Sequence, residues 1–223
     1  MKNQIVVGWM VGTVALAMGL AGCSAATGED NVSSSGEAVT TPVDPVAFCK
    51  ASGLNVIIGT QNNDTLTGTA NADCIVGLGG QDTINAGAGD DIVFAGEGDD
   101  VVNGGDGNDT INAGNGQDNV QGGLGNDTIN GDDGDDQLRG GDGDDTISGG
   151  QGQDRLFGDA GNDKLSGDVG DDQLNGGDGD DSLSDCTNHN VLNGNAGTNT
   201  CQASTTGNGS SSLTNCQTKT ACP

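Results

Sequence analysis

Aliphatic residues recur every nine positions through most of the chain, and polar or small residues fill the positions between them. The aliphatic series is Leu66, Ile75, Ile84, Val93, Val102, Ile111, Val120, Ile129, Leu138, Ile147, Leu156, Leu165, Leu174 and Leu183. An isolated aliphatic side chain with polar neighbours, such as Ile111 between Thr110 and Asn112, is typical of a short strand whose centre points inward. The pattern therefore predicts many short strands whose aliphatic side chains fill a thin core between two facing sheets.

A series of aspartates keeps the same spacing, two positions before the aliphatic residues. Its members are Asp64, Asp73, Asp82, Asp91, Asp100, Asp109, Asp118, Asp127, Asp136, Asp145, Asp154, Asp163, Asp172 and Asp181. In the reference unit, residues 104–112, Gly104, Gly105 and Gly107 permit the positive φ and close backbone approach of a tight turn. Such a turn directs carbonyl oxygens inward, and the Asp at position 6 adds a carboxylate. Oxygen ligands at this density suit Ca²⁺, which takes roughly six to eight of them.

The consensus G-G-x-G-x-D-x-U-x, with U aliphatic, resembles the calcium-binding repeat of the RTX, or hemolysin-type, family. The resemblance covers residues 59–184 well, and two degraded units follow in which Asn190 and Asn199 replace Asp. It implies an all-β fold, a right-handed parallel β-roll (β-solenoid) of nonapeptide repeats in which residue i stacks on residue i+18. The aspartates then line two edges of the roll, and each calcium ion sits between two stacked turns.

The resemblance extends calcium ligation to twelve aspartates, and we expect several Ca²⁺ ions. The expected ligands are Asp82, Asp91, Asp100, Asp109, Asp118, Asp127, Asp136, Asp145, Asp154, Asp163, Asp172 and Asp181. Asp64 and Asp73 are left out because Asn62 and Asn71 stand in their units at position 4, where the turn favours Gly.

The composition indicates that folding depends on a cation. The chain has 43 Gly, 33 acidic residues, 6 Lys or Arg and a formal net charge of −27, which is typical of disorder. One aliphatic side chain per unit contributes about 1.5–3 kcal/mol, whereas ordering the backbone costs about 1–2 kcal/mol per residue. We therefore expect an unfolded chain at low calcium and a folded roll at high calcium. The same charge excludes nucleic acid as a partner, because phosphates are repelled.

The first 22 residues are typical of an export signal. Lys2 precedes an apolar run at 5–20, which is too short to span a bilayer. Residues 20–23, Leu-Ala-Gly-Cys, resemble the lipobox of bacterial lipoproteins. The resemblance implies cleavage before Cys23 and its lipidation, which anchors the chain in the membrane. Ser24 after the cysteine implies the outer membrane of the bacterial cell envelope, facing the periplasm or the cell surface. The alternative is an ordinary signal peptide that leaves Cys23 as a free thiol.

The remaining cysteines bracket the repeats: Cys49, Cys74, Cys186, Cys201, Cys216 and Cys222. An even set in an exported chain favours disulfides, so we expect disulfide-pinned ends whose pairing the sequence does not fix. Cys74, at an outward position, could reach Cys49, and Cys201 stands at an inward aliphatic position. The predicted organisation is a signal peptide at 1–22, a tether at 23–45, an N-terminal cap at 46–58, the roll at 59–202 and a Ser/Thr/Asn-rich tail at 203–223.

Catalysis is not expected. The sequence has no H-E-x-x-H zinc motif and no G-x-S-x-G elbow, and His189 lies in a degraded repeat as a surface residue. We expect a non-enzymatic calcium-binding lipoprotein that folds on Ca²⁺ outside the cytoplasm. The alternative is a calcium-dependent surface adhesion or spacer protein that uses the flat face of the roll, where Thr110, Thr128 and Thr146 would stack.

Overall fold

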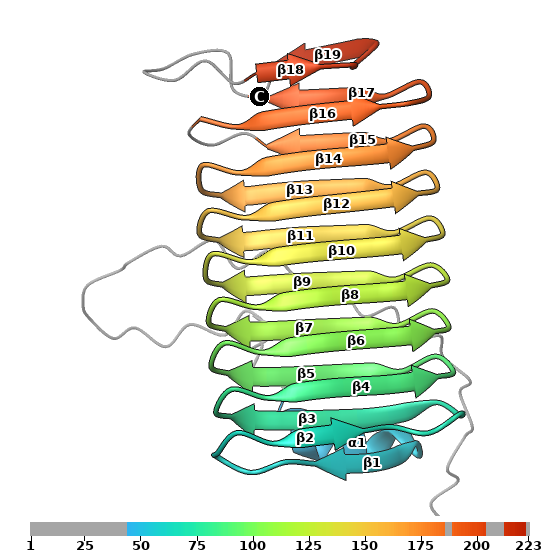
Figure 1. Cartoon of the computed structure of the whole chain (residues 1–223), viewed down its shortest axis with the longest axis vertical. Coiled ribbons are helices and arrows are strands. Elements are labelled where there is room, and N and C mark those ends of the chain that lie inside the picture. The colour runs from blue at the N-terminus through green and yellow to red at the C-terminus, as the bar shows by residue number, and fades with distance from the viewer. Residues whose placement is uncertain (1–43, 186–188, 204–211, 222–223) are drawn as a thin grey trace, which may run out of the picture. The chain divides into compact units, whose positions relative to one another are not determined.

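The computed structural model describes residues 44–185, 189–203 and 212–221, which form a parallel β-solenoid preceded by a short helix (Figure 1). The expected export signal, Cys23, Cys186 and Cys222 lie outside the described residues. Within the described ranges, no helix is long and apolar enough to cross a membrane.

Each coil of the solenoid contributes one strand to each of two parallel sheets (Figure 1). The odd sheet contains β1 (Asn55–Ile58), β3 (Asp73–Gly79), β5 (Ile92–Glu97), β7 (Thr110–Asn115), β9 (Thr128–Asp133), β11 (Thr146–Gln151), β13 (Lys164–Val169), β15 (Ser182–Asp185), β17 (Thr200–Ala203) and β19 (Thr218–Ala221). The even sheet contains β2 (Thr65–Thr67), β4 (Thr83–Ala88), β6 (Val101–Asp106), β8 (Asn119–Leu124), β10 (Gln137–Asp142), β12 (Arg155–Ala160), β14 (Gln173–Asp178), β16 (Val191–Asn195) and β18 (Ser212–Thr214). Thr110 pairs with Thr128 and Thr128 with Thr146, which confirms the stacking of residue i on residue i+18.

The strands are longer than the sequence pattern alone predicts. A typical strand begins at position 7 of one unit and ends at position 3 of the next, as in β7. Two side chains of β7 point inward, the aliphatic Ile111 at position 8 and Ala113 at position 1. Position 1 is confined to small residues in most units, because an added Cβ there meets atoms of its own turn and of the next coil.

The predicted core is confirmed. From Ile75 to Leu192, the aliphatic side chain of every unit is at most 2% exposed, and together they form one continuous cluster. Ile57 and Leu213 pack against the two ends of this cluster. Accordingly, β1 and the pair β18 and β19 extend the sheets beyond the predicted limits of the roll at 59 and 202. The 18-residue offset is kept by β1 and β19, as in Ile57 with Ile75 and Thr200 with Thr218, but β18 pairs with β16 at an offset of 21 residues, as in Val191 with Ser212, so the nine-residue period does not reveal β18.

The helix α1 (Pro45–Ser52) covers the outer face of the odd sheet at its first strands. Asp44 caps its N-terminus by accepting hydrogen bonds from Val46 N and Ala47 N at 3.0 and 3.3 Å. The helix buries Cys49 against outward-facing side chains of β3 and β5, and Phe48 meets Phe94 edge to face with 5.9 Å between ring centroids. The region expected as a cap at 46–58 is therefore a helix on the sheet face followed by the first strand.

Two disulfides lie near the ends of the roll, as predicted. Cys49 is bonded to Cys74 on β3, which holds α1 to the sheet. Cys201, whose side chain is fully buried as expected from its inward position, is bonded to Cys216 between β18 and β19.

Candidate metal centre

The position-6 aspartates lie just before each strand, with their side chains directed into the roll. From Asp73 to Asp181 each is at most 2% exposed. One row along the solenoid holds Asp64, Asp82, Asp100, Asp118, Asp136, Asp154 and Asp172, and the other holds Asp73, Asp91, Asp109, Asp127, Asp145, Asp163 and Asp181. Because neighbouring parallel strands lie about 4.8 Å apart, successive carboxylates of one row are stacked at about that spacing.

One oxygen of each expected ligand is satisfied by the coil before it. The backbone N–H of the aspartate 18 residues earlier donates to Oδ1, as from Asp118 to Asp136 Oδ1 at 2.8 Å and from Asp109 to Asp127 Oδ1 at 2.8 Å. The same bond reaches all twelve, at 2.7–3.0 Å. These bonds fix the orientation of every carboxyl group.

The second oxygen of these carboxyl groups has no hydrogen-bond partner among the described residues. Oδ2 is buried and unpartnered in Asp82, Asp91, Asp100, Asp109, Asp118, Asp127, Asp136, Asp145, Asp154, Asp163, Asp172 and Asp181. Gly104 shows what surrounds this oxygen, since a Cβ built there would lie 2.3 Å from Asp109 Oδ2 and 2.6 Å from the carbonyl oxygen of Gly122. A carboxylate and a main-chain carbonyl therefore face one space without a donor. Buried acceptors of this kind require a partner.

Burial makes these carboxyl groups resist ionisation. Desolvation is the main cause, neighbouring carboxylates add to it, and the bond from the preceding backbone N–H opposes it. The pKa rises to about 7 for Asp127, Asp136, Asp145, Asp154 and Asp163, and to about 6 for Asp91, Asp100 and Asp118. The pKa is also raised for Asp109, Asp172 and Asp181. At neutral pH the rows therefore favour either protons or a cation.

The first two aspartates are satisfied by the protein itself. Asp64 Oδ2 accepts from Thr60 N at 2.6 Å and from Thr60 Oγ1 at 2.9 Å. Asp73 Oδ2 accepts in the same way from Thr69, at 2.5 and 2.9 Å. These two residues were not expected as ligands because Asn stands at position 4 of their units, whereas the structure gives a different reason, the threonine at position 2.

At the other end, Asn199 marks the place where a cation fits. Its Oδ1 accepts from Asp181 N at 2.7 Å, as an aspartate would. Its Nδ2 donates to the carbonyl oxygens of Gly194 and Ala196, at positions 1 and 3 of the same unit, at 2.7 and 2.9 Å. The positive end of this amide thus occupies the site that the other units leave to a cation.

The ligand set of a cation in these turns must include main-chain oxygens. No group of three His, Cys, Asp or Glu side chains among the described residues could hold a metal ion by itself. Carbonyl oxygens together with Asp carboxylates form an all-oxygen set, which fits a hard cation such as Ca²⁺ and not a soft or nitrogen-seeking metal.

Comparison with known families agrees with this chemistry. The sequence model of the RTX calcium-binding nonapeptide repeat (4 copies) matches residues 51–84, 76–111, 85–120, 112–147, 121–156 and 148–183. These matches span more than half of the 223 residues. The chain belongs to the RTX calcium-binding nonapeptide-repeat family. No curated protein matches it. The RTX roll is a structural calcium-binding fold, and this chain is a calcium-binding repeat protein.

One buried carboxylate of the RTX roll was not predicted from the repeat pattern. Asp185, 1% exposed, stands at position 1 of its unit, where the other described units have Gly or Ala. Its unit also has Asn190 at position 6 in place of Asp. These two departures from the consensus, Asp at position 1 and Asn at position 6, occur in the same unit, and together they could have indicated the buried carboxylate.

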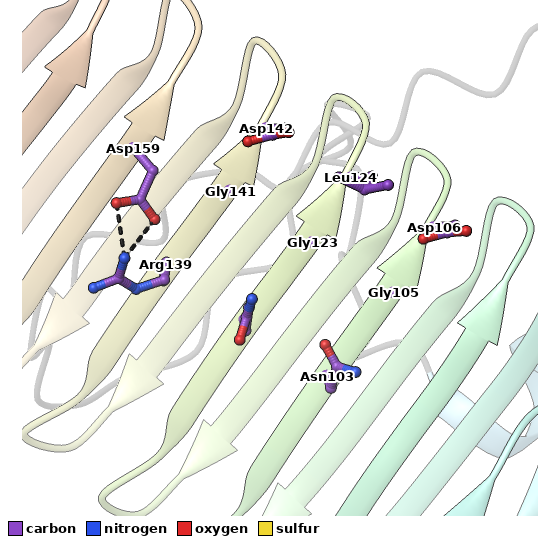
Figure 2. A pocket seen from close by; sticks show the side chains of 10 residues that line it. Asn103, Gly105, Asp106, Gly123, Leu124, Arg139, Gly141, Asp142 and Asp159 are labelled. Carbon is purple, nitrogen blue, oxygen red and sulfur yellow. Dashed lines mark hydrogen bonds and ion pairs between the residues drawn. The ribbon is translucent and has the colours of Figure 1, made fainter.

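A groove of about 470 Å³ crosses the outer face of the even sheet of the RTX roll, away from the aspartate rows (Figure 2). Gly105, Gly123 and Gly141, at position 2 of successive coils, form its floor. Asp159 occupies the next place in this row and closes the groove, where its two carboxylate oxygens accept from Arg139 Nη1 at 2.8 and 2.7 Å (Figure 2). The lining also includes Asn103, Asp106, Gln121, Leu124 and Asp142.

Proposed function

We propose that this protein is a non-enzymatic RTX lipoprotein whose roll folds when Ca²⁺ binds outside the cytoplasm. The observation that carries the proposal is the set of twelve buried Oδ2 atoms without a donor. The non-enzymatic part rests on the residues of this sequence, which contain no H-E-x-x-H zinc motif and no G-x-S-x-G elbow.

Folding and cation binding are linked through these carboxylates. Stacking the coils buries like charges against one another, which opposes folding at neutral pH. A bound Ca²⁺ supplies positive charge and accepts several oxygen ligands at once. The carboxylates of a row then hold neighbouring coils together, because each site takes oxygens from two of them. Binding free energy therefore becomes folding free energy.

The N-terminal ends of both aspartate rows and the C-terminal end of the row that finishes at Asn199 are satisfied without a cation. Thr60 and Thr69 satisfy the first two aspartates, and the Asn199 amide fills its own turn. A disulfide lies near each of these ends. The dependence on Ca²⁺ is thus concentrated in the middle coils, where only aspartates stand at position 6.

The lipobox-like segment supports anchoring of the mature chain through acylated Cys23. A chain that stays unfolded at low cytoplasmic calcium suits export, and it then folds in the calcium-rich medium outside. Two or more acyl chains give stable membrane attachment where one is marginal. On this proposal the roll is attached to the outer membrane, which is supported by Ser24 as the residue that follows Cys23.

The test is far-UV circular dichroism of the oxidised chain during a calcium titration, with magnesium as the control. We expect a cooperative transition to β structure at roughly 10⁻⁴–10⁻³ M Ca²⁺, as for extracellular modules. Magnesium should act poorly, because it prefers octahedral sites and keeps its waters. A roll fully folded in chelator at pH 7 contradicts the calcium-coupled folding. Mass spectrometry of the membrane fraction, with Cys23→Ser as control, tests the acylation.

The groove favours one second candidate, calcium-dependent adhesion to a polyhydroxylated surface polymer. Its rim presents amide, carboxylate and guanidinium groups, which exchange hydrogen bonds with hydroxyl groups. Arg139 is held over Phe157, with 4.9 Å between the guanidinium carbon and the ring centroid, so it is pre-positioned for a ligand. Binding of a glycan panel in Ca²⁺ that is lost in Arg139→Ala supports adhesion, and no binding by the folded roll refutes it.

A further inference from the structure

Two carboxylates converge where one RTX row approaches its C-terminal end. Asp185 Oδ2 lies 2.3 Å, and Asp172 Oδ2 2.6 Å, from the point that a Cβ on Gly167 would occupy. Both residues are 1% exposed. The ordinary arrangement is seen at Gly158, where the same point meets one carboxylate, Asp163, and the carbonyl oxygen of Gly176. At Gly167 a second carboxylate therefore stands in the place of a neutral carbonyl oxygen.

The second carboxylate compensates for a loss in its own unit. Asn190, at position 6, still accepts a hydrogen bond from Asp172 N at 2.8 Å, so the contact between coils is kept. An amide cannot supply the negative charge that the other units place there. Asp185, at position 1 of the same unit, supplies a carboxylate in its place. This carboxylate lies close to that of Asp172.

The other row ends differently, which shows that an Asn at position 6 does not by itself require compensation. The unit of Asn199 has Gly194 at position 1. The Asn199 Nδ2 donates hydrogen bonds to the carbonyl oxygens of the turn. No additional carboxylate is directed into that turn among the described residues. Both rows thus end on an Asn at position 6, but only the row that ends at Asn190 has a pair of carboxylates beside it.

We propose that Asp172 and Asp185 together hold a divalent cation, Ca²⁺, at the last site of their row, with Asp185 as a ligand that the RTX consensus lacks. Apart from its contact with the carboxyl group of Asp185, Asp172 Oδ2 is buried without a hydrogen-bond partner among the described residues. Two buried carboxylates this close cannot both stay ionised unless a cation lies between them, and a 2+ ion balances the pair. The proposal rests on the calcium-binding function proposed above.

The test counts bound Ca²⁺ per full chain by equilibrium dialysis at saturating calcium, with circular dichroism to show that each variant is folded. Asp185→Gly restores the consensus residue at position 1 and should bind one Ca²⁺ fewer than the wild type. Asp185→Asn should show the same loss. The double variant Asp185→Gly/Asn190→Asp moves the carboxylate to position 6 and should regain the ion. Asp171→Asn, which removes an exposed charge beside Asp172, is the matched control and should leave the count unchanged.

Equal counts and affinities for the wild type and Asp185→Gly overturn the proposal, since the pair then holds a shared proton instead of a cation. A wild-type chain that binds no Ca²⁺ is a different result, which refutes the proposed function itself. If Asp185→Asn does not fold, the comparison of Asp185→Gly with the double variant still decides.

Discussion

Replacing a central aspartate by asparagine should stabilise the metal-free roll and weaken the calcium-loaded one. Asp136→Asn keeps the acceptor for Asp118 N, because an Asn Oδ1 does the same at Asn199. Its new Nδ2 can donate to the carbonyl oxygens of positions 1 and 3, as the Asn199 amide does. The amide thus replaces the cation in one turn, and the sign of its effect depends on calcium.

The magnitude follows from the pKa of Asp136, which burial raises from 3.8 to about 7. One pKa unit corresponds to about 1.4 kcal/mol, so ionising this group in the folded chain at pH 7 costs about 4 kcal/mol. The variant removes this cost in chelator. At a calcium concentration about 100 times the dissociation constant, the variant instead loses the roughly 2.7 kcal/mol that one bound ion supplies.

The assay is urea unfolding in calcium, together with the pH of half-folding in chelator, both followed by circular dichroism. In chelator the half-folding pH should move upward by a few tenths of a unit, because several carboxyl groups share the titration. In calcium the unfolding free energy should fall. Asp135→Asn is the matched control, since Asp135 is exposed and an Asn keeps the bond from Gln153 N. Its charge is the smallest of the causes that raise the pKa of Asp136, so this variant should stabilise the roll in chelator less than Asp136→Asn does.

The variant Asp136→Ala separates the effect of the hydrogen bonds that the Asn amide makes from the effect of removing the negative charge. It leaves Asp118 N without its acceptor and the carbonyl oxygens unfilled, so it should gain less than Asp136→Asn in chelator. The reasoning is refuted if Asp136→Asn is no more stable than the wild type in chelator, or if the Ala and Asn variants behave alike.

Three further outcomes are expected. Metal-free roll should form at mildly acidic pH and be lost as pH rises from about 4 to 7, because the folded chain binds more protons than the unfolded one in that window; circular dichroism in chelator checks this. Gly107→Ala should cost about 2 kcal/mol or more, since Gly107 has φ +136° and a Cβ would lie 2.2 Å from the carbonyl oxygen of Gly89; Gly104→Ala, at a position where other units carry Ala, should cost less, and urea unfolding in calcium compares the two. Removing the Cys49–Cys74 disulfide, with a loop of 25 residues, should cost about 3 kcal/mol without changing the number of bound Ca²⁺, as dialysis would show.

The repeating part of the roll can be read from the amino-acid sequence alone. Nine-residue spacing places Ile111 inward and Thr110 outward in one strand, and each further coil repeats that choice. Because one translation of 18 residues generates every neighbour within the repeats, the register, the core and the two aspartate rows follow from one unit. The pairing of Cys49 with Cys74 was also within reach, since Cys74 stands at an outward position next to the first coil.

Which carboxylate oxygens lack a partner depends on the three-dimensional packing and cannot be read from the repeat. Thr60 reaches Asp64 Oδ2 because the turn brings position 2 against position 6. Asp185 meets Asp172 across two coils, and α1 lies on a sheet face, although neither follows from the period. The repeat pattern of a sequence predicts only the contacts that every unit makes. Contacts made once in the chain depend on packing between distant residues, so the spacing of residues carries no signal for them.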